Sequence, residues 1–574
     1  MKDLEKLFIS PKTDLKTIIH RMDGILLNNL PKGIMLVVDE NNQLLGTITD
    51  GDIRRSFKNK KEATLAKDIM NKKPLFFSDQ DSIEIIKKEI PKRLKNRNKT
   101  SRKFLSNIIL VDKKNIPTRM IAYHELWKNE VLDNKNVSVI GLGYVGITLS
   151  LALADTGMIV FGYDINSEKI KELNEGRIDV HENGLDRLLN EHLDKLFFPS
   201  DSLSEDSDVY IVCVSTPVEV NNENNNHQLV LDYIESATKE ISKKLKKGAL
   251  IILRSTIPIG FTRNHIIPII EKTSGLKSGL DFKISFAPER TVEGQAMKEL
   301  RELPQVIGAY DDKSFDDTAK VFSRLTSTIV RVESLEAAEM VKLMNNSFRD
   351  YVFAYSNKLS MIASNFNLDI TDVIESANRG YPRNTIPYPS PGVGGPCLTK
   401  DPYIFSASTE SGNENLFYMS RNINDRMHSH VVERIMNQIK LIGKNKASTK
   451  ILICGLAFKG NPETGDLRNS SSVEVYRIFQ RMNVDIYGFD HVIDKDSLLA
   501  NDIKYHDLNN GIDRFDVIMF LNNHEKNIRL NFFELIRQMN DFPIFFDGWS
   551  QFQKQEILKI RKCIYMNLSV CISS

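Results

Sequence analysis

The sequence predicts an α/β protein in which two parallel-sheet domains are joined by one long helix and preceded by a smaller α+β module. Three observations carry this prediction. A buried-type strand runs into a glycine-rich turn at Gly141–Gly146, and a helix and a second strand follow it. The stretch from Leu335 to about Ala363 has a helical apolar period and few residues that break helices. A second series of strands begins near Lys450 and lacks the glycine pattern.

Size and composition fit a multidomain globular protein. The chain has 574 residues, too many for one hydrophobic core, and its 41% hydrophobic and 26% charged content is ordinary. The net charge of +2 gives no reason to expect a nucleic-acid partner. Five separated cysteines without a CxxC pair indicate a reducing, cytoplasmic setting. Apolar runs are too short to span a membrane and the histidines lack zinc-ligand spacing, so we expect no membrane association and no metal site.

The first module, residues 1–128, contains two copies of a strand-turn-strand-helix unit. In the first copy two apolar runs flank the turn Glu40–Asn42, and a capped helix start follows at Asp50. A weaker second copy begins at Ile108, which indicates an internal repeat. We interpret the basic run at 92–99 as a solvated surface, and residues 131–135 as a short linker.

The segment from Val37 to Arg55 resembles a CBS domain, and residues 1–128 resemble a tandem CBS pair. This resemblance implies an adenine-nucleotide site in which Thr49 and Asp52 contact the ribose and phosphate. The second copy departs from the pattern, because 122–125 read Ala-Tyr-His-Glu where the Thr-x-x-Asp segment would lie. We therefore expect at most one nucleotide site, and a role in assembly alone remains the alternative.

Residues 136–325 carry the order of elements typical of a dinucleotide-binding Rossmann domain. The glycines allow a pyrophosphate to approach closely, and the helix N-terminus supplies N–H groups with partial positive charge. The residues assigned to this turn are Gly141, Gly143, Tyr144, Val145 and Gly146. Asp164, about 20 residues beyond the glycines, suits the ribose hydroxyls and favours NAD over NADP.

Other polar residues are assigned to the cofactor from their places near strand ends. Ligands of open α/β sheets lie at the carboxyl ends of strands, which makes Thr216 and Thr256 candidates for contacts with the cofactor or the reacting carbon. Either threonine is explained equally well as a helix N-cap. Lys169, shortly after Asp164, is assigned to cofactor binding as well.

The predicted central helix carries a polar stripe. Its members, spaced along one face, are Glu339, Lys342, Asn346 and Arg349. A charged stripe on a long helix is usually solvated surface. In a cofactor enzyme, however, a lysine and an asparagine one turn apart form an oxyanion clamp.

The segment Pro391–Pro402 joins three glycines, one cysteine and one aspartate. The glycines let the backbone approach a ligand closely. Cys397 is a soft nucleophile, and Asp401 shares its face if a helix begins there. On local evidence alone, a glycine-rich turn beside a buried cysteine explains the segment at least as well.

Taken together, these motifs resemble the UDP-glucose/GDP-mannose dehydrogenase family over residues 136 to about 550. The matching segments are Gly141–Gly146, Thr256, Pro288–Arg290, Glu339–Asn346, Gly392–Pro402 and Gly455–Lys459. The resemblance implies two Rossmann-like domains joined by a long central helix and preceded by the α+β CBS pair, with NAD as cofactor. It divides the chain into an NAD-binding domain at 136–325, a central region with the cysteine loop at 326–445 and a UDP-sugar-binding domain at 446–574. It also implies a homodimer or higher homo-oligomer formed through the long helix.

The resemblance implies a chemistry and a set of site residues. Family enzymes oxidise C6 of a nucleotide sugar from alcohol to carboxylate with two NAD⁺, through an aldehyde, a thiohemiacetal and a thioester. A cysteine nucleophile lets one site carry out both oxidations without releasing the aldehyde. The residues implied as catalytic are Cys397 as nucleophile, Lys342 and Asn346 as oxyanion donors, and Asp401 and Glu289 in proton movement and hydrolysis. Those implied for the substrate are Arg290, Arg349, Arg383, Gly394, Lys459 and Arg468.

The same resemblance narrows the substrate. Pro288–Arg290 resembles the branch acting on UDP-N-acetylhexosamines, which favours UDP-N-acetylmannosamine or UDP-N-acetylglucosamine and a role in surface polysaccharide synthesis. Tyr381, Pro396 and Trp549 depart from the family pattern. The alternatives are a UDP-glucose 6-dehydrogenase, a two-electron hydroxyacid dehydrogenase, and a nucleotide-sensing protein with an inactive dehydrogenase body.

Overall fold

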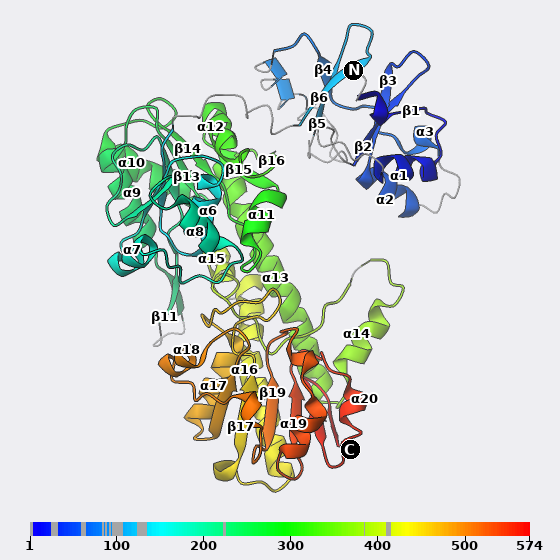
Figure 1. Ribbon diagram of the computed structural model, residues 1–574, viewed down its shortest axis with the longest axis vertical. Helices are drawn as coiled ribbons and strands as arrows, with labels where there is room; N and C mark the ends of the chain where they lie inside the picture. The colour runs from blue at the N-terminus through cyan, green and yellow to red at the C-terminus, as the bar shows by residue number, and fades with distance from the viewer. Residues whose placement is uncertain are drawn as a thin grey trace. The chain divides into compact units, whose positions relative to one another are not determined.

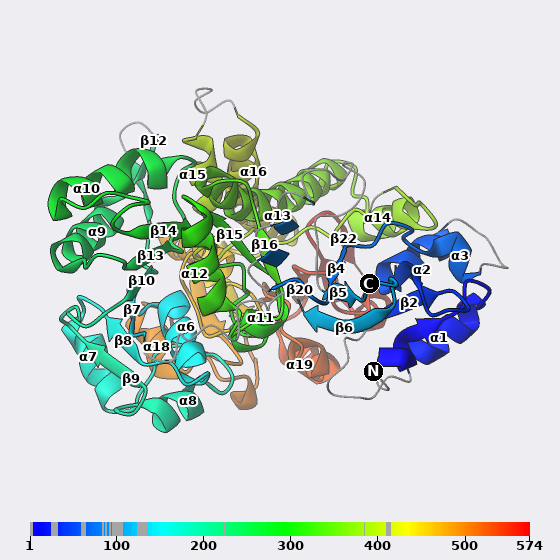
Figure 2. The same ribbon diagram turned by 90° about the horizontal axis from the view of Figure 1, so that it is seen from above.

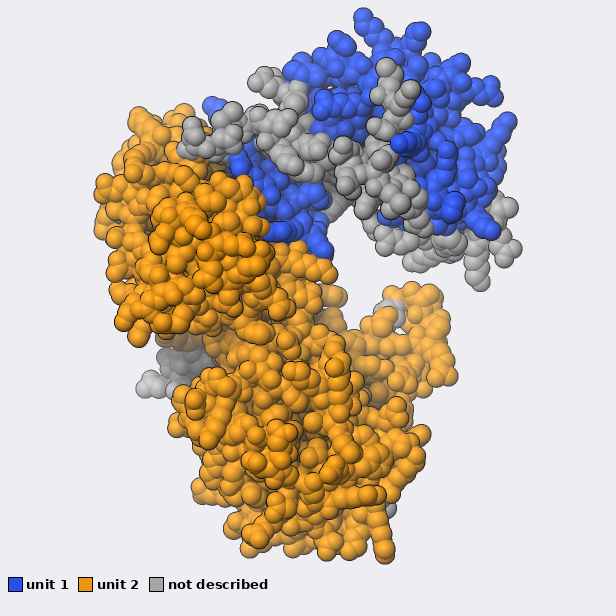
Figure 3. Space-filling view, in the orientation of Figure 1, with its two compact units in different colours: residues 1–134, 301–307, 312–331 blue, residues 135–300, 308–311, 332–574 orange. Residues whose placement is uncertain are grey.

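The computed structural model describes residues 4–23, 33–58, 65–82, 85–86, 89–90, 93, 107–122, 135–221, 226–383, 385–408 and 415–573. It divides into two compact units (Figure 3). Unit 1 comprises Met1–Asn134, Arg301–Ile307 and Asp312–Arg331, and unit 2 comprises Lys135–Leu300, Gly308–Asp311 and Val332–Ser574.

Unit 1 contains the internal repeat predicted from the sequence. Each copy is a three-stranded sheet in which the middle strand pairs parallel with the first and antiparallel with the third. The strands are β1 (Phe8–Ile9), β2 (Ile34–Val38) and β3 (Leu44–Thr49), then β4 (Phe76–Ser78), β5 (Asn107–Val111) and β6 (Pro117–Ala122). Both hairpins carry a bulge and turn on an asparagine with positive φ, Asn42 or Asn115. The strand-turn-strand part of the repeat is therefore confirmed.

The two copies also share turn chemistry and a core. Asp39 and Asp112 each accept hydrogen bonds at Oδ1 from the N–H groups two and four residues later. Ile109 and Val111 of the second copy pack in the core of the first. The helices of the first copy are α1 (Leu15–Asp23), α2 (Asp50–Lys58) and α3 (Ala66–Ile69). The predicted Tyr123–Glu125 segment, the linker residues 131–134 and the basic run apart from Arg93 lie outside the described residues.

The remaining part of unit 1 is short. It holds α12 (Asp312–Phe322) and β16 (Ile329–Arg331), and β16 pairs parallel with the first three residues of β15 (Gln305–Ala309). The intervening residues that end β15, Gly308 and Ala309, belong to unit 2.

The first half of unit 2 is a parallel sheet with the order β14-β13-β10-β7-β8-β9. Its strands are β7 (Val137–Ile140), β8 (Val160–Tyr163), β9 (Phe197–Ser200), β10 (Val209–Val212), β13 (Leu250–Leu253) and β14 (Lys283–Phe286). The central strands β7, β10 and β13 are wholly buried, as a sheet covered on both faces requires. Figure 2 shows α9 (Asp232–Lys244) and α10 (Ile267–Ser274) on one face and α6 (Tyr144–Ala154) on the other.

The second half of unit 2 repeats this plan. Its sheet has the order β18-β17-β19-β20-β21-β22 and is parallel except for the last pair. The strands are β17 (Lys450–Cys454), β18 (Asp485–Phe489), β19 (Val517–Phe520), β20 (Ile544–Asp547), β21 (Ile564–Met566) and β22 (Cys571–Ser573). Its helices are α17 (Ser471–Arg481), α18 (Lys495–Ala500), α19 (Phe532–Gln538) and α20 (Lys554–Ile557).

A helix of 30 residues, α13 (Leu335–Ser364), runs from the first sheet of unit 2 to the second (Figure 1). Ser334 caps it by accepting a hydrogen bond at Oγ from the Ala337 N–H at 3.2 Å. α16 (Leu416–Leu441) packs along α13. The predicted class, two Rossmann-like domains joined by a long central helix, is therefore confirmed. No described helix is both long and apolar enough to span a bilayer.

Candidate active site

The glycine turn after β7 has the geometry of a phosphate cradle. Gly141 has a φ of 88°, and a Cβ on Gly146 would lie 1.8 Å from the Gly141 carbonyl oxygen, so both positions need glycine. Gly143 caps α6 without a side chain, and nothing lies within 4 Å of the place a Cβ would take. The first N–H groups of α6 have no partner within the helix, as at any helix N-terminus. This arrangement fits the pyrophosphate of a bound dinucleotide.

Asp164 and Lys169 lie beside this turn, as the cofactor assignment requires. Asp164 accepts a hydrogen bond at Oδ2 from the Leu142 N–H at 2.8 Å and one at Oδ1 from the Asn166 N–H at 3.0 Å. Lys169 Nζ lies 3.5 Å from the Leu142 carbonyl oxygen and 3.4 Å from Asp179. The turn and the acidic residue are therefore fixed to each other before any ligand arrives.

The Tyr144 side chain forms a hydrogen bond that could not be predicted from the sequence. Its hydroxyl donates to the buried carboxylate of Glu182, which also accepts from the Gly294 N–H at 2.9 Å. Burial, together with this acceptor, raises the pKa of Tyr144 far above the ordinary tyrosine value. Tyr144 therefore connects the phosphate turn to the segment that follows Glu289.

Thr216 and Thr256 lie together at the ends of β10 and β13. Thr216 is buried, and its Oγ1 donates to the Thr256 carbonyl oxygen at 2.6 Å. Neither threonine caps a described helix, since the N-caps of the next two helical segments are Leu231 and Phe261. The N-cap alternative is wrong for both residues.

Glu289 lies in a buried ion pair with Arg254, a residue that the sequence alone did not single out. The two side chains are 8% and 1% exposed. Burial by itself raises the pKa of Glu289, but the positive charges of Arg254 and Lys342 outweigh it and hold this pKa at about 2. Glu289 is thus ionised near neutral pH, and its lowered pKa makes it a weak base there.

The glycines of the cysteine loop are required by packing against the second sheet domain. A Cβ on Gly394 would lie 2.6 Å from the Asn469 carbonyl oxygen, and one on Gly395 would lie 2.8 Å from the Phe458 ring. Gly395 and Gly392 also have φ values of 95° and 134°. Gly394 was implied as a substrate contact. In the structure it is glycine because the Asn469 backbone, distant in sequence, leaves no room for a side chain.

Cys397 is exposed, and the positive charge of Lys342 on α13 acts on its thiol. The crowding of protein atoms raises the pKa of this thiol, and the Lys342 ammonium acts in the opposite direction. The Cys397 carbonyl oxygen accepts from the N–H groups of Lys400 and Asp401, at 3.2 and 3.0 Å, where α15 (Asp401–Ser406) begins. α15 thus begins four residues after Cys397, with Asp401 as its first residue.

Asn346 and Asp401 are bonded directly to each other. Asn346 Nδ2 donates to Asp401 Oδ2 at 2.6 Å, and Lys400 Nζ lies 2.8 Å from Asp401 Oδ1. The Asp401 side chain is fully buried. Asp401 therefore orients the Asn346 amide, while Lys400 balances its charge.

The polar stripe on α13 divides into buried and exposed members. Glu339 accepts hydrogen bonds from the N–H groups of Gly260 and Thr262 at 2.6 and 3.0 Å, and it is buried together with Lys342. Arg349 is exposed. The solvated-surface interpretation is therefore wrong for Glu339 and Lys342.

The other residues implied for the substrate are spread over several places. Lys459 Nζ donates to the Glu293 carbonyl oxygen at 2.5 Å, and Arg468 forms an ion pair with Asp466 at 2.6 Å. Burial lowers the pKa of Arg290 beside the ionised Glu289. Arg383 is exposed, and its Nη1 donates to the Tyr381 hydroxyl at 3.3 Å.

A cleft of about 700 Å³ lies between the phosphate turn and the second sheet domain of unit 2. Residues that line it include Gly143, Tyr144, Lys169, Glu293, Thr464, Arg468 and Asn469. Cys397 does not line the cleft itself, but Asn469 bonds the cysteine loop by accepting from the Gly395 N–H at 3.2 Å. The cleft therefore adjoins the loop.

Glu293 is a site residue that the motif comparison missed. Thr464 Oγ1 donates to its Oε1 at 2.6 Å, and its charge acts on Cys397. Burial raises the pKa of Glu293, although the Thr464 hydrogen bond lowers it. The sequence shows only that a second glutamate follows Glu289 by four residues. The hydrogen-bond partner of Glu293, Thr464, lies 171 positions later in the chain, so no local pattern predicts the contact.

Two of the three departures from the family pattern have local contacts. Trp549 donates from Nε1 to the Leu521 carbonyl oxygen at 2.9 Å, which ties the end of β20 to that of β19. The Arg383 guanidinium lies 5.4 Å from the centroid of the Tyr381 ring. Nothing in the structure explains the choice of proline at 396.

In unit 1, Thr49 and Asp52 bond to each other at the start of α2. Asp52 Oδ2 accepts from the Thr49 N–H at 2.8 Å and from Thr49 Oγ1 at 2.7 Å. Its other oxygen accepts from Arg55. This is a helix-capping arrangement, and the nucleotide site stays a prediction.

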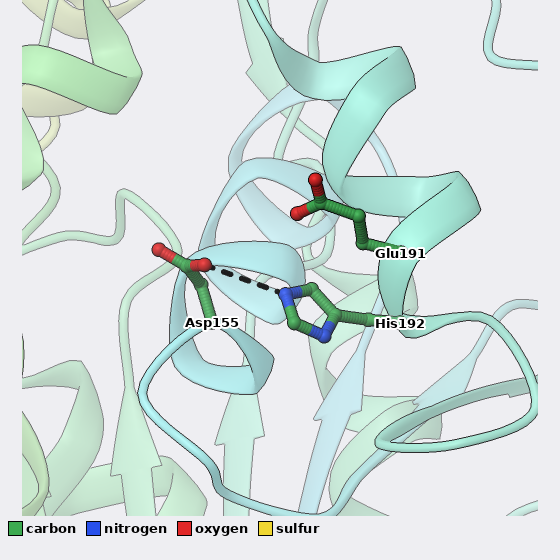
Figure 4. A group of neighbouring side chains, drawn as sticks. All are labelled: Asp155, Glu191 and His192. Atoms are coloured by element: carbon green, nitrogen blue, oxygen red, sulfur yellow. Dashed lines mark hydrogen bonds and ion pairs between the residues drawn. The ribbon is translucent and has the colours of Figure 1, made fainter.

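One group of side chains among the described residues has metal-ligand character. Figure 4 shows Asp155 and His192 facing each other at the ends of α6 and α8 (Leu185–His192), with Glu191 beside them. His192 Nε2 lies 3.4 Å from Asp155, and Glu191 accepts hydrogen bonds from Arg187. Surface ion pairing accounts for this group, and we assign no metal to it.

Comparison with known proteins places the geometry in a family context. Models of the UDP-glucose/GDP-mannose dehydrogenase family match residues 135–326 (NAD binding domain), 336–426 (central domain) and 452–554 (UDP binding domain), and a CBS domain model matches 2–59. A UDP-N-acetyl-D-mannosamine dehydrogenase of Pyrococcus horikoshii is 33% identical over 357 residues, 62% of this chain and 83% of that protein. Its counterpart from Campylobacter jejuni is 35% identical over 345 residues, 59% of this chain and 82% of that protein. A solved UDP-D-ManNAc dehydrogenase structure from Pyrococcus horikoshii has a TM-score of 0.68 and 29% identity, covering 76% of this chain and 99% of its own.

Proposed function

Because the chain belongs to the UDP-glucose/GDP-mannose dehydrogenase family, it is an NAD-dependent nucleotide-sugar dehydrogenase, and we propose that it oxidises the C6 hydroxyl of a UDP-N-acetylhexosamine to a carboxylate. The observation that carries this proposal is an exposed Cys397 thiol within the field of the buried Lys342 ammonium. NAD, when bound at the glycine turn, accepts a hydride from C6 in each of two oxidations. The product would serve as a precursor of surface polysaccharide.

The roles of the protein groups follow from the bonds that form and break. The first oxidation removes a hydride and a proton from the C6 alcohol and leaves an aldehyde. The Cys397 thiolate then adds to C6, and the charge that develops on oxygen lies near Lys342 and Asn346. Loss of a second hydride gives a thioester, and water releases the thiolate and the carboxylate. The sum is one sugar alcohol, two NAD⁺ and one water converted to one carboxylate, two NADH and three protons.

Glu293 is the base that we assign to the hydrolytic water. A base must be deprotonated, so the raised pKa of Glu293 places the acidic limb of hydrolysis above the range of an ordinary glutamate. In Glu293→Gln we expect hydrolysis slower by roughly 10²–10⁴-fold, with a burst of two NADH per site before slow turnover. Stopped-flow absorbance at different pH values measures both effects. A Glu271→Gln control, at a surface ion pair with Lys277, should behave as wild type; hydrolysis at the normal rate in Glu293→Gln would remove this assignment.

The sugar is tested by supplying a panel of UDP-sugars and measuring NADH. The relatives named above act, by their names, on UDP-N-acetylmannosamine, which makes this sugar our first choice over UDP-N-acetylglucosamine and UDP-glucose. Two NADH per UDP-N-acetylmannosamine would support the proposal. One NADH per substrate would favour a two-electron dehydrogenase. No turnover with any of the sugars, together with ATP or AMP binding that Asp52→Ala abolishes, would favour a nucleotide sensor.

We also propose that two copies associate through α13. Six large apolar side chains, spaced three, four or seven residues apart, form a stripe that is 38–65% exposed. They are Met340, Met344, Phe348, Tyr351, Tyr355 and Ile362. A continuous apolar stripe along a helix of this length fits the same stripe of a second copy.

Phe348→Asp is expected to shift this dimer toward monomer. A charge placed in the middle of the apolar stripe would lose its water on association, which is costly without a partner. Leu280→Asp is the matched control, because Leu280 is 88% exposed and lies outside α13. Light scattering after size exclusion measures the mass. An unchanged dimer in Phe348→Asp would place the interface elsewhere.

A further inference from the structure

Arg421 on α16 is fully buried, and its guanidinium reaches the cysteine loop on both sides of Cys397. Nη2 donates to the Val393 carbonyl oxygen at 2.9 Å. Nη1 makes a longer contact of 3.5 Å with the Leu398 carbonyl oxygen. Val393 lies four positions before Cys397 and Leu398 one position after it. One side chain thus contacts both flanks of the reactive segment.

The same guanidinium is held in place by carboxylates on both long helices. Nη1 donates to Asp350 Oδ1 on α13 at 2.6 Å, and Nη2 donates to Asp425 Oδ1 on α16 at 2.8 Å. Asn424 Nδ2 also donates to Asp350 Oδ1 at 2.8 Å. Each donor is directed by a charged acceptor, so the plane of the guanidinium has one preferred orientation.

The network continues to the start of the loop. Asn357 Nδ2 donates to Asn424 Oδ1 at 2.8 Å, and Asn357 Oδ1 accepts from the Ser390 N–H at 2.8 Å. Ser390 Oγ in turn donates to the Gly392 carbonyl oxygen at 2.9 Å. α13 therefore carries Lys342, which acts on the thiol, and also the groups that fix the backbone bearing that thiol.

Stability alone does not explain a network of this kind. The desolvation of a buried ion pair opposes its Coulomb attraction, and well-packed apolar residues often serve a helix interface equally well. What apolar residues cannot do is hold two backbone carbonyl groups at fixed positions.

We infer that Arg421 is a positioning residue for Cys397, because its guanidinium fixes the loop backbone on both sides of the thiol and so sets the thiol against Lys342. This inference deepens the proposed function and rests on it for the catalytic consequence. The structural consequence, restraint of the loop, stands independently of turnover.

Arg434 provides a matched control on the same helix. Its Nε and Nη2 donate to the carbonyl oxygens of Asn567 and Val570 at 3.2 and 2.9 Å. Among the described residues, the hydrogen bonds of the Arg434 guanidinium thus hold two backbone carbonyls of the segment before β22 and not the cysteine loop. Lysine at either position keeps the positive charge but cannot reach two carbonyls in a fixed plane.

Hydrogen exchange of the full-length protein tests the restraint without any substrate. In Arg421→Lys we expect the amides of Gly395, Lys400 and Asp401 to exchange about tenfold faster or more, since a charged hydrogen bond is lost on each side. Arg434→Lys should instead accelerate exchange at Asn567 and leave the loop unchanged. Equal loop protection in Arg421→Lys and wild type would overturn the inference, whether or not the enzyme turns over UDP-sugars.

Kinetics then test the consequence. Arg421→Lys is expected to lower kcat about tenfold or more with KM for NAD unchanged, and to release aldehyde so that NADH per sugar falls below two. Arg434→Lys should keep the wild-type ratio. Asp425→Asn is a milder change, because the Asp425 carboxylate that pairs with Arg421 is half-exposed. It should give a ratio of NADH to sugar between those of Arg421→Lys and wild type, and it tests the inference if Arg421→Lys fails to fold. A ratio of two in Asp425→Asn and Arg421→Lys, with unchanged kcat, would contradict the inference.

Discussion

Replacing Cys397 with serine is expected to abolish formation of the carboxylate while leaving NAD binding unchanged. A serine hydroxyl stays protonated near neutral pH and is a much weaker nucleophile than a thiolate. Carboxylate formation should therefore fall by roughly a thousandfold or more. Product analysis by mass spectrometry, with NADH counted in parallel, measures this loss. NAD affinity should stay at the wild-type value, since the glycine turn lies in the first sheet domain.

Cys571→Ser is the matched control for this change. Cys571 is partly buried and its Sγ donates to Gln438 at 3.3 Å, so serine can keep that hydrogen bond. It should retain full activity. Carboxylate formed by Cys397→Ser at the wild-type rate would show that the nucleophile is another group.

Replacing Lys342 with methionine is expected to produce the second largest loss, roughly 10²–10³-fold in kcat. Methionine keeps the length and apolar stem of this buried side chain and removes its charge. The charge acts on the Cys397 thiol in the direction of a lower pKa. Without it the thiol pKa rises further, so the thiolate forms at higher pH and alkylation of Cys397 by iodoacetamide shifts upward in pH. The oxyanion formed at C6 also loses its cationic partner.

Lys440→Met, on an exposed position of α16, is the control for loss of a lysine charge. It should leave both kcat and the alkylation profile unchanged. An alkylation profile that does not move in Lys342→Met would mean that Lys342 does not act on the thiol.

Elements with strong local patterns could be predicted from the sequence. The helix predicted from Leu335 to about Ala363 is found at Leu335–Ser364, because thirty residues of helical period leave little freedom for its ends. The turn at Gly141–Gly146 was equally predictable, since the positive φ of Gly141 and the contact between Gly146 and the Gly141 carbonyl oxygen are set within the turn itself.

The ion pairs and pKa values of the site depend on contacts between residues that lie far apart in the chain. Arg254 lies 35 positions before Glu289, and this pairing makes Glu289 an ionised group with a pKa of about 2 rather than a proton acceptor. Arg421 lies 71 positions after Asp350. No local sequence pattern predicts either ion pair.

The glycines of the cysteine loop show the same limit. Their sequence indicates close approach of the backbone to some group, which is correct. The groups that require it, at Gly394 and Gly395, are Asn469 and Phe458 of the second sheet domain. The requirement for glycine at these two positions therefore comes from the packing of the loop against a part of the chain that is distant in sequence.

The central claim is that Cys397 carries the sugar as a thioester between the second oxidation and hydrolysis. The most direct measurement is the mass of the Cys397 peptide from Glu293→Gln enzyme, quenched in acid during turnover with NAD and the UDP-sugar that yields NADH. We predict an acyl adduct of that UDP-sugar on Cys397, absent from Cys213 and Cys571 and absent when NAD is omitted. A full burst of two NADH per site with an unmodified Cys397 peptide would contradict the account.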